Sequence, residues 1–372
     1  MHIALEGLCL GARNTGIGVC TANLLAGLKQ LECPEQFTIY TSNFEGAQEI
    51  ERPESACVVT VAHSANSRLL RAAWRRLCLN RKLRRTGVDV LHGTAYVLPK
   101  RCPGVAAVVT VHDVIALTHP EFCPTLNSWH FRRQLPRTVK VADRIIVHSK
   151  ATADELVSIL GVGTSKIAVL RPGIADRFFK EVSQEERESV SLRYRLPERY
   201  VLFAGNLEPK KDLETLLAAL ERLSETEYPG KLVLTGPQGW KNRALTDKLR
   251  GMANRVQVTG YVRTEDMPAV YAGADAAVLV SQVEGFGLPV VEAMAAGTPV
   301  IASDIPGLKE ASGEAALKVK PGDVQGLVDG LKRVLGDNGL RTELITRGRK
   351  HAQEFRSIDY ARQHLEIYRG LR

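Results

Sequence analysis

Short runs of apolar residues recur along this chain, and the longer stretches between them repeat apolar residues every three or four positions. The runs predict buried strands, and the longer stretches predict amphipathic helices. In the first half we expect strands at residues 2–6, 37–40, 57–61, 88–92, 106–111, 144–148 and 166–170, and helices at 19–31, 126–142 and 150–160. This alternation is typical of a parallel sheet with helices on both faces.

The alternation pauses at Arg171-Pro172-Gly173, and residues 180–198 are polar and rich in charge. It then restarts, with strands expected at 200–204, 231–235, 255–259, 275–281, 299–302 and 317–319, helices at 212–223, 241–252 and 264–272, a helix after the glycine loop at 285–287, and two closing helices. We therefore expect an α/β protein of two Rossmann-like doubly wound domains, residues 1–172 and 173–355, facing across a cleft. A terminal helix at 356–372 is expected to pack back on the first domain.

Composition narrows the class of protein. The 372 residues suffice for two or three domains, and a hydrophobic content of 44% with 24% charged residues is that of a globular protein. The start, MHIALEGLCLG, lacks the features of a signal peptide, and no apolar run is long enough to span a membrane, so we expect a cytoplasmic protein. The seven cysteines are odd in number and form no CxxC pair, which argues against zinc and against a disulfide framework.

The net charge of +9 is unevenly spread, because Arg68 to Arg85 holds eight basic residues and no acidic one. Its apolar residues have partly helical spacing. One interpretation is a solvated helix face, and the other is peripheral attachment to anionic lipid at the inner face of the membrane. Nucleic acid is not an expected partner, because Trp74 is the segment's sole aromatic residue for stacking on bases.

Candidate chemistry begins with Ser281 to Gly297, SQVEGFGLPVVEAMAAG, which combines a strand end, a glycine loop and a helix start marked by Pro289. Free amides and the dipole at a helix start attract phosphate. Glu284 lies in the loop and Glu292 is expected in the first helical turn, and their spacing keeps them off a common helix face. We interpret them as acceptors for different hydroxyls of one long anionic ligand.

Three other loops at strand ends carry candidate chemistry. Gly205 to Asp212 places two adjacent cations, Lys210 and Lys211, where a helix starts, which suits a diphosphate. Gly16-Ile17-Gly18 lets backbone approach a phosphate. His112 follows a strongly apolar strand and can exchange a proton with a reacting group. Each also has an ordinary explanation: surface lysines, a tight turn, and a hydrogen-bonded strand end.

Together these residues resemble retaining glycosyltransferase family 4, which has the glycosyltransferase B architecture of two facing Rossmann-like domains. The two-glutamate spacing in EGFGLPVVEAMAAGTPVIAS is similar to that family's signature, and GIG, VHD, GNLEPKKD and GYV follow in family order. The resemblance covers almost the whole chain, more loosely in the first domain. GNLEPKKD and GPQGW are similar to a subgroup rich in mannosyltransferases of bacterial polysaccharide assembly.

The resemblance implies an acceptor-side first domain and a second domain that binds the nucleotide sugar. Glu292 would accept hydrogen bonds from the ribose hydroxyls, Glu284 would contact the donor sugar, and Lys211 would neutralise the diphosphate. The remaining implied contacts are the backbone amides of Phe286, Gly287 and Leu288 to sugar and phosphates, the backbone of Val262 to the base, Gly16 and Gly18 to the diphosphate, and His112 to the transferred sugar.

One position departs from the family pattern. Many members have arginine where this chain has Asn206. Asparagine can hydrogen-bond to phosphate but brings no charge, so the diphosphate has one cation fewer unless Lys210 compensates.

The implied reaction moves a hexose from a nucleoside diphosphate sugar to a saccharide or lipid-linked saccharide, with retention at the anomeric carbon. GDP-mannose is the favoured donor. His112, Glu284 and Lys211 are the implied catalytic residues, and the leaving phosphate takes the proton of the incoming hydroxyl. No Asp-x-Asp motif lies near the donor loops, so we expect neither a metal nor a cofactor.

Three alternatives remain open at this point. The first is a UDP-sugar-dependent transferase of the same fold, for example a glucosyltransferase. The second is a nucleotide-sugar 2-epimerase, which the two-glutamate signature makes less favoured than a transferase. The third is a polyanion-binding protein built around Arg68 to Arg85. This alternative would give the second domain no function.

Overall fold

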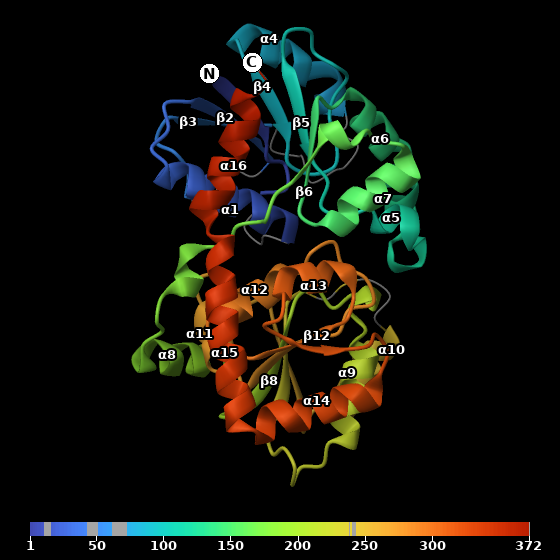
Figure 1. The fold of residues 1–372 in the computed structure, drawn as a ribbon, viewed down its shortest axis with the longest axis vertical. Coiled ribbons are helices and arrows are strands. Elements are labelled where there is room, and N and C mark those ends of the chain that lie inside the picture. Colours follow the sequence, from blue (N-terminus) through green and yellow to red (C-terminus); the bar gives the residue numbers. More distant parts are fainter. Residues whose placement is uncertain (11–15, 43–50, 62–72, 238, 240–242, 372) are drawn as a thin grey trace. The chain divides into compact units, whose positions relative to one another are not determined.

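The computed structural model describes residues 1–10, 16–42, 51–61, 73–237, 239 and 243–371. Contacts divide the chain into two compact units (Figure 1). Unit 1 comprises Met1–Ala175 and Phe355–Arg372, and unit 2 comprises Asp176–Glu354. The expected domain boundaries followed residues 172 and 355, and the last helix, α16 (Ser357–Arg369), belongs to unit 1.

Unit 1 is built on a seven-stranded parallel sheet in the order β3-β2-β1-β4-β5-β6-β7. The strands are β1 (His2–Glu6), β2 (Gln36–Thr41), β3 (Ala56–Thr60), β4 (Val90–Gly93), β5 (Ala106–Thr110), β6 (Arg144–Val147) and β7 (Ile167–Val169). Most of these strands are short apolar runs, as expected where helices cover both faces of a parallel sheet. The order reverses between β1 and β4, which in doubly wound folds marks the ligand-binding edge.

The helices of unit 1 pack on opposite faces of this sheet. One face carries the π-helix Arg75–Leu79, α4 (Asn80–Thr86), α6 (Thr125–Val141) and α7 (Lys150–Leu160) over a shared hydrophobic core. The other face carries α1 (Gly16–Gln30) and α16, which lie side by side (Figure 1). Gly27 allows this close packing, because a Cβ there would lie 2.0 Å from the carbonyl oxygen of Ser357.

Unit 2 has a six-stranded parallel sheet in the order β10-β9-β8-β11-β12-β13. Its strands are β8 (Tyr200–Ala204), β9 (Lys231–Thr235), β10 (Val256–Gly260), β11 (Ala276–Leu279), β12 (Val300–Ser303) and β13 (Leu317–Val319). Its helices are α8 (Gln184–Tyr194), α9 (Leu213–Arg222), α10 (Arg243–Gly251), α11 (Met267–Ala272), α12 (Leu288–Ala295), α13 (Pro306–Ser312), α14 (Val324–Gly336) and α15 (Asn338–Ala352). The order reverses between β8 and β11. The expectation of two Rossmann-like α/β units is confirmed.

The hydrophobic pattern missed several helices. α8 lies in the segment that we described only as polar, and Val190 is its one buried residue. Its start is set by Ser183, whose side chain accepts a hydrogen bond from the amide of Glu186. The short helices α5 (Ile115–Thr118) and α13 were also missed, and three helices rather than two close the chain.

Two expectations about loops were wrong. Gly16 and Gly18 lie in the first turn of α1 and not in a loop before it. Glu292 is the fifth residue of α12, beyond the first turn, although Pro289 does lie at the helix start.

Part of the basic segment faces inward. The guanidinium of Arg75 donates to Oε1 of the buried Glu6 from Nε and Nη2, at 2.9 and 2.6 Å. Arg81, Lys82, Arg84 and Arg85 are exposed, while residues 68–72 lie outside the described part of the chain.

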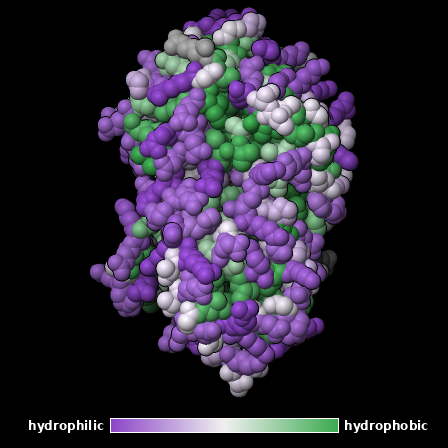
Figure 2. All heavy atoms as spheres, in the orientation of Figure 1, coloured by the Kyte–Doolittle hydropathy of each residue, from purple (hydrophilic) through white to green (hydrophobic). Residues whose placement is uncertain are grey.

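Hydrophilic side chains cover much of the face shown in Figure 2, with smaller groups of hydrophobic ones between them. None of the helices in the ranges that the structure describes combines the length and the hydrophobicity needed to cross a bilayer.

Candidate functional site

The candidate site of unit 2 lies where β8 and β11 end, at the reversal of strand order. The loop after β8 carries Lys210 and Lys211, and the loop after β11 carries Glu284. A backbone hydrogen bond of 2.8 Å from the amide of Gln282 to the carbonyl of Lys210 joins the two loops. Parallel strands that neighbour each other end at the same edge, so the sheet brings these distant segments together.

Two glycines allow the second loop its shape. Gly287 has φ +107 and caps the start of α12, a conformation that residues with a Cβ avoid. Gly307 lies under the loop, and a Cβ there would meet the carbonyl oxygen of Glu284 at 2.3 Å. The position of Glu284 therefore depends on close backbone packing.

Glu284 is the centre of a buried charge cluster formed with Lys210, Lys211 and Ser281. Its side chain is 7% exposed and pairs with Lys210 Nζ at 3.2 Å and with Lys211 Nζ, which donates to Oε1. The Ser281 hydroxyl donates to the same Oε1 at 2.8 Å. Two cations therefore meet one carboxylate in this cluster.

The charge state of Glu284 follows from these neighbours. Burial alone would raise the pKa of its carboxyl, but Lys210, Lys211 and the Ser281 hydroxyl outweigh burial and hold the pKa at about 2. Glu284 is therefore a carboxylate at neutral pH and acts as a hydrogen-bond acceptor.

Glu292 has the opposite environment. Burial raises the pKa of its carboxyl to about 7, although the Tyr271 hydroxyl, which donates to Oε2 at 3.2 Å, and the charge of Arg177 both lower it. The two glutamates are thus held in different protonation states near pH 7.

Of the remaining candidates in unit 2, Asn206 donates through Nδ2 to Glu208 Oε1 at 3.1 Å. Phe286, Gly287 and Leu288 form the entry to α12, with Gly287 as its N-cap. Val262 is buried, with 5% of the residue exposed.

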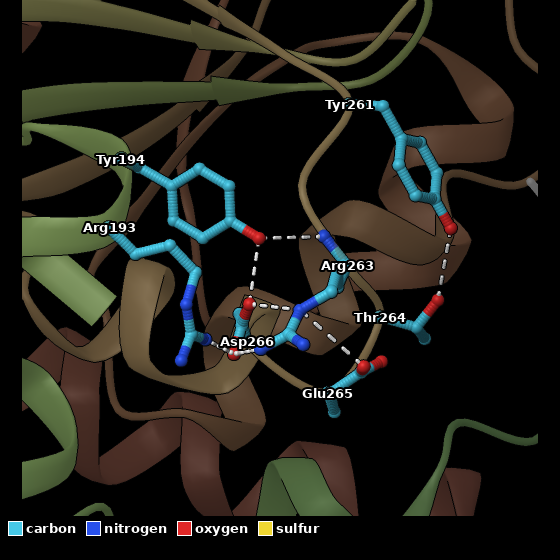
Figure 3. A network of polar contacts seen from close by, with 7 residues as sticks. All are labelled: Arg193, Tyr194, Tyr261, Arg263, Thr264, Glu265 and Asp266. Carbon is cyan, nitrogen blue, oxygen red and sulfur yellow. Dashed lines mark hydrogen bonds and ion pairs between the residues drawn. The ribbon is translucent and has the colours of Figure 1, made fainter. Parts of the chain in front are cut away.

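A polar network holds the loop that carries Val262, as Figure 3 shows. Asp266, whose side chain is 7% exposed, accepts hydrogen bonds from Arg193 Nη1 and the Tyr194 hydroxyl, each at 2.7 Å. Arg263 donates to it from Nε at 2.8 Å and from Nη2 at 3.1 Å. The amide of Arg263 donates to the Tyr194 hydroxyl at 3.2 Å. The network therefore fixes the residue after Val262 to the end of α8.

In unit 1, the structure places His112 two residues beyond β5. Its Nε2 lies 2.9 Å from the carbonyl oxygen of Thr94, and its ring contacts Tyr96 and His148. Gly16 is exposed and Gly18 is buried at the start of α1.

Sequence reasoning gave no role to several residues that shape the site. Ser281, Tyr271 and Arg177 act on the two glutamates, yet each belongs to a common residue type in an ordinary pattern. The only usable signal was the position of Ser281, at a strand end directly before the glycine loop.

The comparisons with known proteins agree on both halves of the chain. Residues 184–351 match the family model described as "Glycosyl transferases group 1", and residues 14–178 match "Glycosyltransferase Family 4". The O-antigen chain mannosyltransferase B of Escherichia coli is 30% identical over 76% of this chain and 74% of its own length. The glycogen synthase of Mycobacterium tuberculosis is 31% identical over 63% of this chain, which covers 55% of the synthase.

Solved structures share the fold over the full chain. Sucrose-phosphate synthase from Thermosynechococcus elongatus has a TM-score of 0.81 at 22% identity, covering 100% of this chain and 99% of its own. Alr3699/HepE of Anabaena, solved in complex with UDP and glucose, has a TM-score of 0.77 at 17% identity and covers 100% of both chains.

The network around Asp266 gives a testable prediction for stability. Burial alone would raise its pKa, but Arg263, Tyr194 and Arg193 outweigh burial and hold it at about 2. Because the folded pKa lies below the ordinary value of 3.8, the carboxylate stabilises the fold above about pH 4, and this contribution disappears as the pH falls through 2. We expect Asp266→Ala to lower the free energy of unfolding by about 1–3 kcal/mol at pH 7, and by less at pH 3, in urea titrations.

The matched control is Asp247→Ala, whose carboxylate is 63% exposed and pairs with Arg250 at 3.4 Å. We expect a change within about 0.5 kcal/mol, as for most surface substitutions. Equal effects of the two substitutions would contradict the structural role of Asp266.

Proposed function

We propose that this chain, which belongs to the group 1 and family 4 glycosyl transferases, transfers mannose from GDP-mannose to a saccharide or lipid-linked saccharide of cell-surface polysaccharide biosynthesis. The observation that carries the proposal is the buried cluster of Glu284 with Lys210 and Lys211, at the strand edge where doubly wound folds bind ligands. The choice of mannose is supported by the likeness to the mannosyltransferase of Escherichia coli.

The cluster suits a diphosphate ligand for an electrostatic reason. Two ammonium groups share one carboxylate, and both are largely shielded from water, with side-chain exposures of 17% and 10%. When a diphosphate binds, Lys210 and Lys211 can turn toward it, and Glu284 is left to accept hydrogen bonds from sugar hydroxyls. The amides at Phe286, Gly287 and Leu288 add positive potential at the start of α12.

The proposed chemistry retains the anomeric configuration. As the glycosidic bond breaks, negative charge grows on the leaving β-phosphate, where Lys211 and the loop amides stabilise it. The acceptor hydroxyl attacks the same face of the sugar and gives its proton to that phosphate, so no protein nucleophile is required. Glu292 binds the ribose, the backbone of Val262 meets the base, and His112 lies beside the transferred sugar, with Gly16 and Gly18 by the diphosphate.

A UDP-sugar is the second candidate donor, which the complex of Anabaena Alr3699/HepE with UDP and glucose supports. Asn206 does not decide between the donors, since it contacts Glu208 and brings no charge. A 2-epimerase differs in a directly observable way, because it would release an epimerised nucleotide sugar without any acceptor.

We also propose that unit 1 attaches peripherally to anionic membranes. Leu77, Leu126 and Trp129 are 72%, 80% and 60% exposed, and helices α4 and α6 pack on the same face of the sheet. Exposed basic residues on α4 and α6 are Arg81, Lys82, Arg84, Arg85, Arg132, Arg133, Arg137 and Lys140, and the guanidinium of Arg133 lies 5.0 Å from the centre of the Trp129 ring. Apolar side chains among cations are the composition that binds at a lipid interface.

The donor prediction is tested with a panel of nucleotide sugars. We expect GDP-mannose to raise the melting temperature more than UDP-glucose or ADP-glucose, and to yield GDP when lipid-linked saccharides are added. EDTA should leave GDP release nearly unchanged.

The variant Lys211→Met should show no rise in melting temperature with GDP-mannose. A larger shift with UDP-glucose would favour the UDP-sugar alternative, and no response to any sugar would contradict the proposal.

The raised pKa of Glu292 predicts a proton coupling to donor binding. Ribose hydroxyls that donate to this carboxyl favour its ionised form, so binding should lower its pKa from about 7 and release a proton. At pH 6.5 we expect release of up to about 0.8 proton per GDP-mannose. The measurement is calorimetry in buffers of different ionisation enthalpy. GDP-mannose is the suitable ligand, because its diphosphate has no terminal group that titrates near pH 6.

Two variants control this measurement. Glu292→Gln should abolish the proton release and weaken binding, because the amide cannot accept from both hydroxyls equally. Glu214→Gln, at an exposed position on α9, should leave both unchanged. Proton release that persists in Glu292→Gln would assign the titration to another group.

Membrane attachment is tested by flotation with vesicles of phosphatidylglycerol and phosphatidylcholine. We expect binding at low salt that weakens as salt screens the charges. The triple variant Arg81→Ala, Arg84→Ala, Arg85→Ala should bind less. A control that removes the same charge elsewhere, Lys180→Ala, Arg222→Ala, Lys350→Ala, should bind like the natural protein. A protein that never floats at low salt would refute attachment.

A further inference from the structure

Three side chains able to bind a metal ion meet in unit 1: Cys20, His112 and His148. One candidate ligand atom of each lies within 4.8 Å of the other two. Cys20 lies near the start of α1, while the histidines follow the neighbouring strands β5 and β6. Cys20 is 6% exposed and His148 is 4% exposed. The group therefore joins a helix start to two strand ends inside the unit.

Each histidine has one ring nitrogen held by a backbone carbonyl. His112 Nε2 lies 2.9 Å from the carbonyl oxygen of Thr94, and His148 Nδ1 lies 3.3 Å from that of Leu170. Because a carbonyl only accepts, these two nitrogens carry the hydrogen, and the lone pairs reside on His112 Nδ1 and His148 Nε2. Metal-binding histidines are commonly oriented in this way, with the second nitrogen donating to a carbonyl or carboxylate.

The lone pair of His148 is left without a donor. Its Nε2 is buried and has no hydrogen-bond partner among the described residues. His92, also buried in unit 1, shows the contrast, since its Nδ1 lies 2.6 Å from the Tyr368 hydroxyl and its Nε2 lies 2.8 Å from that of Thr110. A buried polar atom without a partner is costly, and a bound metal ion would satisfy it.

We propose that Cys20, His112 and His148 form a zinc site, with water as the fourth ligand. As the Zn–S bond forms, the Cys20 thiol releases its proton to the buffer, and the two imidazoles bind through their lone pairs. Ligand atoms around tetrahedral zinc lie about 3.3–3.8 Å apart, so side-chain movements of about 1 Å close the group. One thiolate with two imidazoles favours zinc over magnesium or calcium, which prefer oxygen.

This site revises the conclusion from cysteine spacing. No CxxC pair is needed, because the fold brings one cysteine and two histidines together from separate elements. In the proposed transfer reaction, His112 Nδ1 is the ring nitrogen available to contact the sugar, and zinc would occupy the same nitrogen. We therefore expect zinc to inhibit transfer, and this expectation alone rests on the proposed function.

The experiment is a titration of the full-length reduced protein with Co²⁺, followed by displacement with Zn²⁺. We expect an absorption band from sulfur-to-cobalt charge transfer, which reports a thiolate ligand directly. Cys20→Ser should remove the band, and His148→Gln should weaken zinc binding by about 10–100-fold or more, since second-shell losses alone cost that much. Cys102→Ser is the matched control, because Cys102 is 5% exposed and lies outside the group.

Melting temperatures of all variants show whether they fold. If Cys20→Ser does not fold, the zinc affinity of His148→Gln tests the site instead, and an affinity equal to that of the natural protein overturns it. No charge-transfer band, or an equal band in Cys20→Ser, overturns the site. This failure is distinct from a failure of the proposed function, which would appear as no response to any nucleotide sugar. Zinc bound at Cys20 without an effect on GDP release would support the site and remove His112 from the transfer.

Discussion

The candidate site of unit 2 depends on a buried carboxylate that must keep two cations beside it. Burying Glu284 without partners would cost several kcal/mol, and Lys210 and Lys211 offset this cost only if the loops after β8 and β11 stay together. The parallel sheet supplies that proximity, because neighbouring strands end at one edge. The backbone bond between Gln282 and Lys210 then fixes the distance between the loops. Gly307 is a consequence of the same constraint, since the backbone of Glu284 leaves no room for a side chain there, while at Gly287 the Leu308 side chain takes that space.

Much of this arrangement was predictable, because strands are short and almost wholly apolar in both units. The strands at 2–6, 200–204, 231–235 and 317–319 were placed to the residue, and the loop with Lys210 and Lys211 follows the second of them. The strand before the Glu284 loop was expected at 275–281 and covers Ala276–Leu279. α8 was not predictable in the same way, because a helix that buries only Val190 leaves almost no hydrophobic period. Glu292 was placed one turn too early, since the sequence shows where a helix can start but not where its first hydrogen-bonded turn closes. The site roles themselves stay predictions.

Tertiary contacts explain the rest of what sequence reasoning missed. One interpretation of the basic segment was a solvated helix face, yet Arg75 pairs with the buried Glu6 at the end of β1. Cys20, His112 and His148 are ordinary residues in sequence and become a group only when α1, β5 and β6 converge. No local sequence pattern indicates that these three residues lie together in the fold. Spacing rules for metal sites therefore apply only where the ligands are close along the chain.

The two glutamates show how one loop and helix give similar side chains different chemistry. Glu284 is ionised because two lysines reach it, and it is therefore an acceptor at any pH in the physiological range. Glu292 lies eight residues further on, where a tyrosine hydroxyl and a more distant arginine compensate burial only in part, so its carboxyl titrates near pH 7. The fixed negative charge of Glu284 holds the two ammonium groups of Lys210 and Lys211 beside it. The difference between them follows from which charges reach each carboxyl, and the residue type alone does not encode it.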